Sequence, residues 1–309
     1  MEEHHSDRTY RFFKKTIQKV GKRLREVSLP GFQGVAIYDV IWFFINGIQQ
    51  GALNTRASSI SFNFLLALGP ALIFLLSLIP FLPVENFKEE FLDVVEGIIP
   101  MNSYEIIKIQ IEALFQQRFG LTSFGLLTSL FFAQKGIHGI TEAFNATHHT
   151  IETRTWYKQR LASIGLVFIF YILVIVAFIL IVYNKLFLQH LVNLNIIEMN
   201  LRYYLLNSAK WIILVLLTFC SISTMYYFGT SRRTKWSFFS AGSSLATILA
   251  VITSICFTYF MNHFAQLNKF FGSIGAIMAL MLWMNFNALT LLIGFELNAS
   301  INRAQKKRR

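Results

Sequence analysis

Long apolar runs separated by short polar connections dominate the pattern of the chain. A helix needs about 20 mostly apolar residues to cross the hydrocarbon core of a bilayer. Six runs meet this requirement, and they predict transmembrane helices at residues 57–82, 119–144, 160–184, 204–229, 237–261 and 271–300. The pattern therefore predicts an all-α polytopic membrane protein, a six-helix transmembrane bundle with interfacial amphipathic helices.

Three other stretches have helical character without the length or apolarity of a span. The run at 35–48 is short and contains Asp39, which indicates an interfacial or re-entrant helix, with a seventh span as the alternative. Residues 85–118 predict two amphipathic helices on the external face. In the N-terminal segment, one apolar stripe is flanked by basic faces, which suits an anionic inner leaflet better than a nucleic-acid-binding arm. The stripe consists of Phe13, Ile17, Val20, Leu24 and Val27.

The charge distribution predicts the orientation of the chain. The formal net charge is +12, and the basic residues concentrate in alternate connections and at both termini. Because cytoplasmic loops carry the excess of Lys and Arg, the basic-rich side is predicted to be cytoplasmic. The organisation is then a basic cytoplasmic segment (1–34), a transmembrane domain (35–301) and a basic cytoplasmic tail (302–309). This organisation predicts a multi-pass protein of the bacterial plasma (inner) membrane with both termini in the cytoplasm.

Composition and motifs argue against an enzyme. Hydrophobic residues make up 54% of the chain and charged residues 14%, against roughly a quarter charged in soluble domains. The seven histidines form neither an H-x-H-x-D-H nor an H-E-x-x-H arrangement, and no Walker loop or nucleophile elbow is present. We therefore predict no catalytic residue, no metal site, no cofactor and no nucleic-acid partner.

Polar side chains inside the predicted spans are the candidate functional residues, because burying them in hydrocarbon is costly unless they are paired or hydrated. The second span carries a stripe of three such residues, and the sixth carries two pairs on opposite faces. They are Lys135, His138 and Glu142, then Asn285 with Glu296, and Asn287 with Asn298.

Two of these residues support specific hypotheses. Arg56 and Glu296 are predicted at the same depth, so a structural ion pair between the first and last spans is expected; a proton- or ion-coupled role for Glu296 is the alternative. Lys135 lies near the midplane without a carboxylate at its own depth. It is expected either to extend its ammonium toward the interface or to face a hydrated, anion-attracting cavity with His138.

Small residues at a spacing of four predict close helix packing, with a hinge as the alternative. The glycines that form this pattern are Gly136, Gly139, Gly272 and Gly275.

Several segments together resemble the YihY/BrkB family of membrane proteins. The similarity rests on SISFNFLLALGPALIFLLSLIP (59–80), on FFAQKGIHGITEAFNATH (131–148) and on FGSIGAIMALMLWMNFNALTLLIGFELNAS (271–300). The chain departs from the family pattern at Phe271, Phe295 and Lys135. The resemblance implies a six-helix inner-membrane protein; the family has carried the labels ribonuclease and virulence-associated membrane protein.

These observations leave a transporter or permease of unidentified substrate as the first functional hypothesis. A non-transporting envelope scaffold or assembly protein is the alternative, and ribonuclease activity is disfavoured. The predicted partner is the lipid bilayer, contacted through the basic N-terminus, and homo-oligomerisation stays open.

The charge bias makes a topology prediction. Reporter fusions on the external side should report outside, and those on the basic side should report inside. The external positions are after residues 100, 195 and 265, and the internal ones after 152, 233 and 305. An N-terminus accessible from outside the cell would contradict the six-span arrangement.

Overall fold

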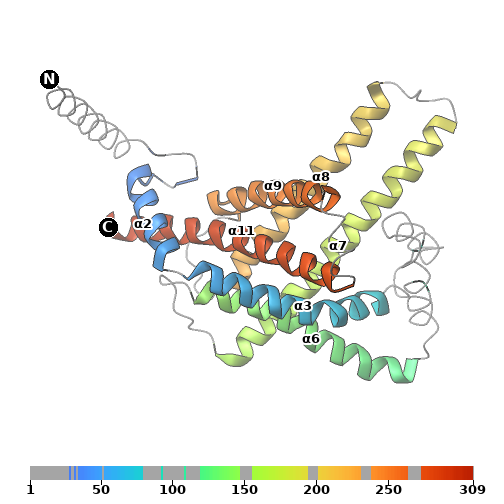
Figure 1. Cartoon of the computed structure of the whole chain (residues 1–309), viewed down its shortest axis with the longest axis horizontal. Coiled ribbons are helices and arrows are strands. Elements are labelled where there is room, and N and C mark those ends of the chain that lie inside the picture. The colour runs from blue at the N-terminus through green and yellow to red at the C-terminus, as the bar shows by residue number, and fades with distance from the viewer. Residues whose placement is uncertain are drawn as a thin grey trace.

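The computed structural model describes residues 28, 31–32, 34–50, 52–78, 92, 108, 119–146, 155–193, 201–230, 238–263 and 273–308. Within these residues the chain forms helices and no strand, which confirms the all-α class (Figure 1). The helices are α2 (Ile37–Gln50), α3 (Leu53–Leu78), α6 (Phe119–Asn145), α7 (Trp156–Asn193), α8 (Leu201–Gly229), α9 (Ala241–His263) and α11 (Ser273–Arg308).

Four of these helices contain segments that are long and apolar enough to cross a membrane. The segments are Trp156–Ala177, Lys210–Gly229, Ala241–Met261 and Ile277–Lys306. Helices α3 and α6 coincide with the first two predicted spans, but they are not among these four segments. The described residues therefore support a membrane protein, and the count of six spans stays a prediction.

Helix ends differ from the predicted ends where hydropathy and backbone preference disagree. Helix α7 continues to Asn193 although its apolar run ends near 184, because no glycine or proline after Gly165 interrupts it. Helix α11 likewise continues to Arg308, through the predicted tail. The predicted N-terminal stripe (13–27) and the external helices at 85–118 lie outside the described residues, apart from Leu92 and Lys108.

The long helices pack in chain order and close on themselves. Helix α3 packs on α6, α6 on α7, α7 on α8, α8 on α9 and α9 on α11, while α11 also packs on α3. Three buried aromatic rings fill the interior. The rings of Phe144 and Phe295 stack at a centroid distance of 4.5 Å, and Tyr226 meets both edge-on. The Tyr226 hydroxyl donates to the carbonyl of Leu291 at 2.6 Å, so this buried phenol is satisfied.

Helix α2 packs on the C-terminal half of α11, and the two lie together at one end of the molecule (Figure 1). Val40 and Phe43 form a small core with Ile301, and the Arg303 guanidinium lies 5.2 Å from the centre of the Phe43 ring. On its other side, α2 exposes Trp42 and two isoleucines. This apolar face is what the interfacial interpretation of the segment requires.

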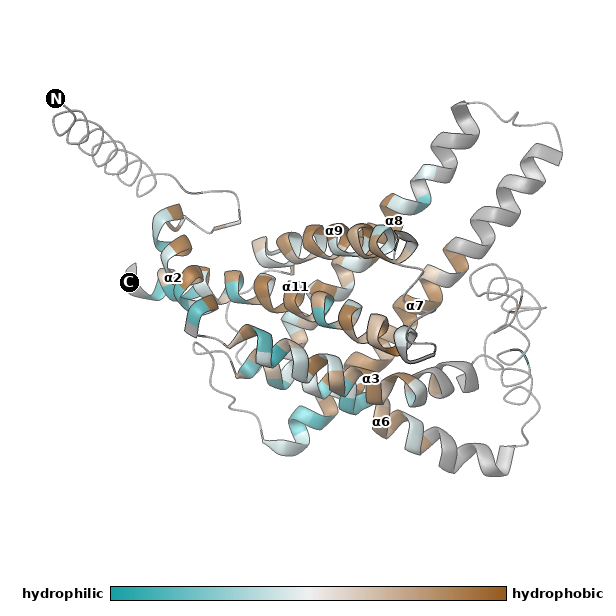
Figure 2. Ribbon diagram, in the orientation of Figure 1, coloured by the Kyte–Doolittle hydropathy of each residue, from teal (hydrophilic) through white to brown (hydrophobic). Residues whose placement is uncertain are grey.

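Apolar residues predominate along the described parts of α7, α8, α9 and α11, whereas polar residues are more frequent toward the end that holds α2 and the C-terminus of α11 (Figure 2). Large apolar side chains such as Ile212 on α8 and Ile255 on α9 are each 64% exposed. A soluble protein rarely exposes large contiguous apolar patches. These faces are therefore suited to contact lipid.

Helices α9 and α11 cross in close backbone contact. A Cβ added to Gly294 would meet the carbonyl oxygen of Gly242, and a Cβ on Gly242 would meet the carbonyl oxygen of Gly294. Both positions therefore need glycine, in the way that small residues allow helix backbones to approach in membranes.

Gly294→Ala should lower the stability of the detergent-solubilised protein by about 1–3 kcal/mol, because the methyl group has no space and must push α9 away from α11. Thermal unfolding followed by intrinsic fluorescence measures this. Gly165→Ala is the matched control, since nothing lies within 4 Å of a Cβ at that position. Equal effects of the two substitutions would contradict the close crossing.

Candidate functional site

Arg56 and Glu296 come together where α3, α6 and α11 meet. Arg56 lies in the first turn of α3, and Glu296 is fully buried in α11. The two side chains interact electrostatically. The Nε and Nη2 groups of Arg56 also donate to the carbonyl oxygen of Ala143, at 2.9 and 2.6 Å.

The Ala143 carbonyl is one of the last four of α6, which lack partners within their own helix. A cation at this position also interacts favourably with the negative end of the helix dipole. Arg56 therefore caps α6 while it offsets the charge of Glu296.

Helix α2 contributes a fourth wall to this cluster through Gly47. A Cβ at Gly47 would collide with the Glu296 carboxylate, so the α2 backbone lies directly against it. Any larger residue at position 47 would separate α2 from α11. The buried carboxylate is therefore enclosed by α2 on one side and Arg56 on another.

Asn298 anchors the start of α9. Its Oδ1 accepts a hydrogen bond from the backbone N–H of Gly242 at 2.8 Å, and its Nδ2 donates to Ser240 Oγ at 2.8 Å. Ser240 and Ser243 also bond reciprocally: each hydroxyl accepts from the other's backbone N–H, at 3.1 and 3.2 Å. Together they form a capping arrangement for a helix start. Asn298 thus acts in helix packing.

Two further asparagines of α11, Asn285 and Asn287, each donate a hydrogen bond. Asn285 Nδ2 donates to Ser58 Oγ of α3 at 3.2 Å, so Asn285 and Glu296 both face α3. Asn287 Nδ2 donates to the carbonyl of Trp283 at 2.8 Å, within its own helix. The structure therefore brings Asn285 and Glu296 to one neighbour and Asn298 to another, α9.

The stripe predicted on the second span divides between two environments. Lys135 lies exposed on the outer surface, with its ammonium 5.4 and 5.6 Å from the ring centres of Phe131 and Phe132. His138 and Glu142 instead line a polar cavity of about 320 Å³. Lys135 is in the lining of neither this cavity nor the apolar one described below, so the structure does not bring it to His138's cavity.

The polar cavity lies where α6 ends, α7 begins and α8 ends. Its lining combines a histidine, a carboxylate, two amides and two hydroxyl side chains. These residues are His138, Thr141, Glu142, Asn145, Ala146, Gln159, Ala162, Ser163 and Gly229. Hydropathy alone did not indicate either Gln159, which precedes the predicted span at 160–184, or Ser163, which lies in the first turn of that span.

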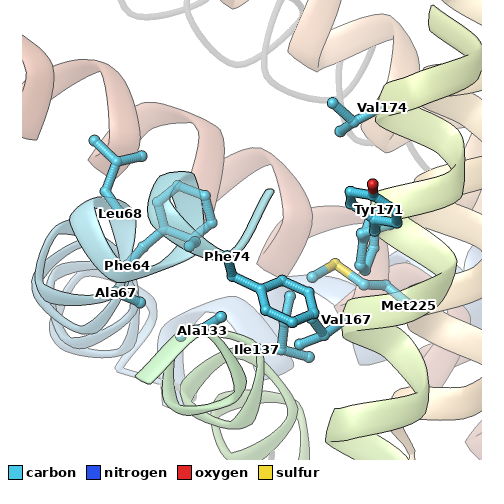
Figure 3. Close-up of a pocket in the computed structure, with 13 residues that line it drawn as sticks. Phe64, Ala67, Leu68, Phe74, Ala133, Ile137, Val167, Tyr171, Val174 and Met225 are labelled. Atoms are coloured by element: carbon cyan, nitrogen blue, oxygen red, sulfur yellow. The ribbon is translucent and has the colours of Figure 1, made fainter. Parts of the chain in front are cut away.

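A second, apolar cavity of about 340 Å³ lies further along the same α6–α7 interface, between α3, α6, α7 and α8 (Figure 3). Ile137 lines this cavity and the adjacent His138 lines the polar one, so the two cavities are neighbours on α6. The apolar cavity was not predicted from the sequence, because apolar side chains that line a cavity look the same in sequence as those that fill a core.

The glycines of the second span allow α3 to approach α6. A Cβ on Gly136 would lie 2.7 Å from the Ala67 Cβ, and one on Gly139 would lie 2.9 Å from Asn63 Nδ2. Gly275 is buried in α11, and Gly272 lies outside the described residues.

A partly buried polar contact between α6 and α7 was also not anticipated. Arg160 donates from Nη1 to the Gln134 Oε1 at 3.0 Å, and its guanidinium lies 5.6 Å from the centre of the Trp156 ring. As for metals, no group of three or more His, Cys, Asp or Glu side chains gathers within the described part of the chain.

The fold and its apolar surface define an all-α integral membrane protein. A family model described as "Virulence factor BrkB" matches residues 44–309, and the chain belongs to this BrkB family. The family is one of membrane proteins, and the expected resemblance is thereby confirmed.

Two relatives share part of the sequence. The ribonuclease-like protein YfkH of Bacillus subtilis (strain 168) is 27% identical over 253 residues, which cover 82% of this chain and 91% of that protein. A UPF0761 membrane protein of Tolumonas auensis is 27% identical over 93 residues, covering 30% of this chain and 31% of that protein. No solved structure matches the chain.

Arg56→Ala and Glu296→Ala should each destabilise the solubilised protein, by about 3–5 kcal/mol, because each leaves a buried charge without its compensating neighbour. The double mutant should lose less than the sum, since residues in contact are not additive. Chemical unfolding of the four proteins measures the coupling. Asn287→Ala, which removes a bond within one helix, is the control; strict additivity of Arg56 and Glu296 would contradict their contact.

Proposed function

We propose that the protein is a transporter or permease whose substrate path lies between α6, α7 and α8. The observation that carries this proposal is the pair of adjacent cavities, one polar and one apolar, along the α6–α7 interface. Ligand sites between helices of a bundle have this character, with volumes of about 300–1,000 Å³ and a few placed polar groups.

The polar cavity belongs, in this proposal, to the cytoplasmic end. It lies at the C-terminal ends of α6 and α8 and at the start of α7. The connections that follow and precede these ends are the basic-rich ones, which the positive-inside rule assigns to the cytoplasm. A solute would thus reach His138 and Gln159 from inside the cell.

The polar side chains at the contacts of α3 and α11 support the proposal by a different argument. Arg56, Glu296 and Asn298 are engaged at helix–helix contacts, and none of them lines either cavity. The polar side chains that line the polar cavity belong instead to α6 and α7. A non-transporting envelope scaffold, the alternative, needs neither cavity.

A screen of solutes against the purified, detergent-solubilised protein tests the proposal. One solute class should raise the unfolding temperature by several degrees, since a ligand at about 100 times its dissociation constant stabilises by roughly 2.7 kcal/mol.

His138→Ala and Gln159→Ala should abolish this stabilisation, because they remove polar groups from the cavity. Lys135→Ala is the matched control and should retain it, because that side chain lies on the outer surface of α6. If no class stabilises the protein, or if the cavity variants respond like the native chain, the scaffold alternative is favoured.

A further inference from the structure

The apolar cavity has walls from two separate packing units of the fold. Helices α3 and α6 pack together on one side, and the α7–α8 hairpin forms the other (Figure 3). Phe74 of α3 reaches across to α7, with its ring centre 6.0 Å from that of Phe168 and 6.2 Å from that of Tyr171. Phe74 and Tyr171 both line the cavity, so this aromatic contact between α3 and α7 forms part of its wall.

The lining of this cavity favours hydrocarbon over water. Tyr171 contributes the one hydroxyl among its lining side chains, all of which belong to the described residues. Water needs two to four polar partners to occupy a cavity, and apolar cavities of this kind stay dry. An empty cavity would leave the lining atoms without dispersion contacts on one side. The chemistry of the lining therefore calls for an apolar occupant.

The cavity also borders the surface that faces lipid. Val174 lines it and is 47% exposed, and the neighbouring Ile172 of α7 is 58% exposed. An acyl chain in the bilayer thus has a lateral approach beside Val174. Deeper in the cavity, Ile137 and Val167 are only 9% and 7% exposed. Lipids that merely surround the protein do not reach these two side chains.

We infer that the apolar cavity binds an acyl chain of a bilayer phospholipid. The headgroup of this phospholipid is directed toward the polar cavity at His138. The two cavities are adjacent on α6, and Ser163 and Val167 place them one helical turn apart on α7. This inference rests on the proposed function, because it names the substrate class of the same pair of cavities.

Photo-crosslinking of lipid to the full-length chain tests the inference. The protein is reconstituted in phosphatidylethanolamine and phosphatidylglycerol vesicles that contain a trace of phospholipid with a diazirine in the middle of one acyl chain. After irradiation, modified peptides are mapped by mass spectrometry. Ile137 and Val167 should carry lipid, while Ile255 on the exposed face of α9 reports the surrounding lipid.

Val174→Phe should reduce labelling of Ile137 and Val167 several-fold by filling the approach, and leave Ile255 unchanged. Val176→Phe is the matched control, since Val176 is exposed on the same helix but outside the cavity lining. Ala71→Leu narrows the cavity from the opposite wall, so the test stands if one variant fails to fold.

Labelling of Ile255 without labelling of Ile137 or Val167 would overturn the inference. The proposed function would still stand, because it is tested separately by solute-dependent stabilisation. Equal labelling in Val174→Phe and Val176→Phe would also overturn it. Cavity labelling in a protein that no solute stabilises would support the lipid site while the proposed function fails.

Discussion

The desolvation of Arg56 and Glu296 constrains the arrangement of the helices around them. Charges at these depths are stable only with compensating partners. Arg56 is compensated by Glu296 and by the last turn of α6, and Glu296 is enclosed by Gly47 of α2. These requirements fix α2, α3, α6 and α11 at one common depth. Asn298, only two residues after Glu296, then fixes the start of α9 relative to α11.

This polar cluster constrains one end of the molecule. The interface of α3 and α6 with α7 and α8, here called the seam, depends mainly on apolar packing. Helices α3 and α11 are joined by hydrogen bonds and charge, and α9 and α11 by glycine-to-glycine backbone contact. Across the seam, α3 meets α7 through the ring of Phe74. Apolar contacts in lipid have no hydrophobic driving force, so their closeness depends on shape alone. Both cavities lie along the α6–α7 side of this seam, where movement would break few polar bonds.

Much of the fold was predictable from hydropathy, whereas helix rotation was not. Six predicted runs coincide with α3, α6, α7, α8, α9 and α11, because burial in lipid requires length and apolarity that a sequence displays directly. The proximity of Arg56 and Glu296 was predictable, because the sequence placed both residues at the same depth in the bilayer. The stripe of Lys135, His138 and Glu142 does not share one environment in the structure. The rotation of α6 about its axis is set by the packing of Gly136 and Gly139 against α3, which hydropathy does not specify. Asn298 can cap α9 only because α11 crosses the start of α9, and no local sequence pattern specifies that crossing.

The engagement of Glu296 bears on how the proposed permease could be driven. A carboxylate that releases and binds a coupling proton must change its charge without dismantling the fold. Loss of the charge on Glu296 would remove the carboxylate that offsets the charge of Arg56, at a point where α2, α3, α6 and α11 meet. Glu142 is different, because it is exposed and lines the polar cavity. We therefore propose that Glu296 holds the helices together and that exchange with solvent falls to the polar groups of α6 and α7.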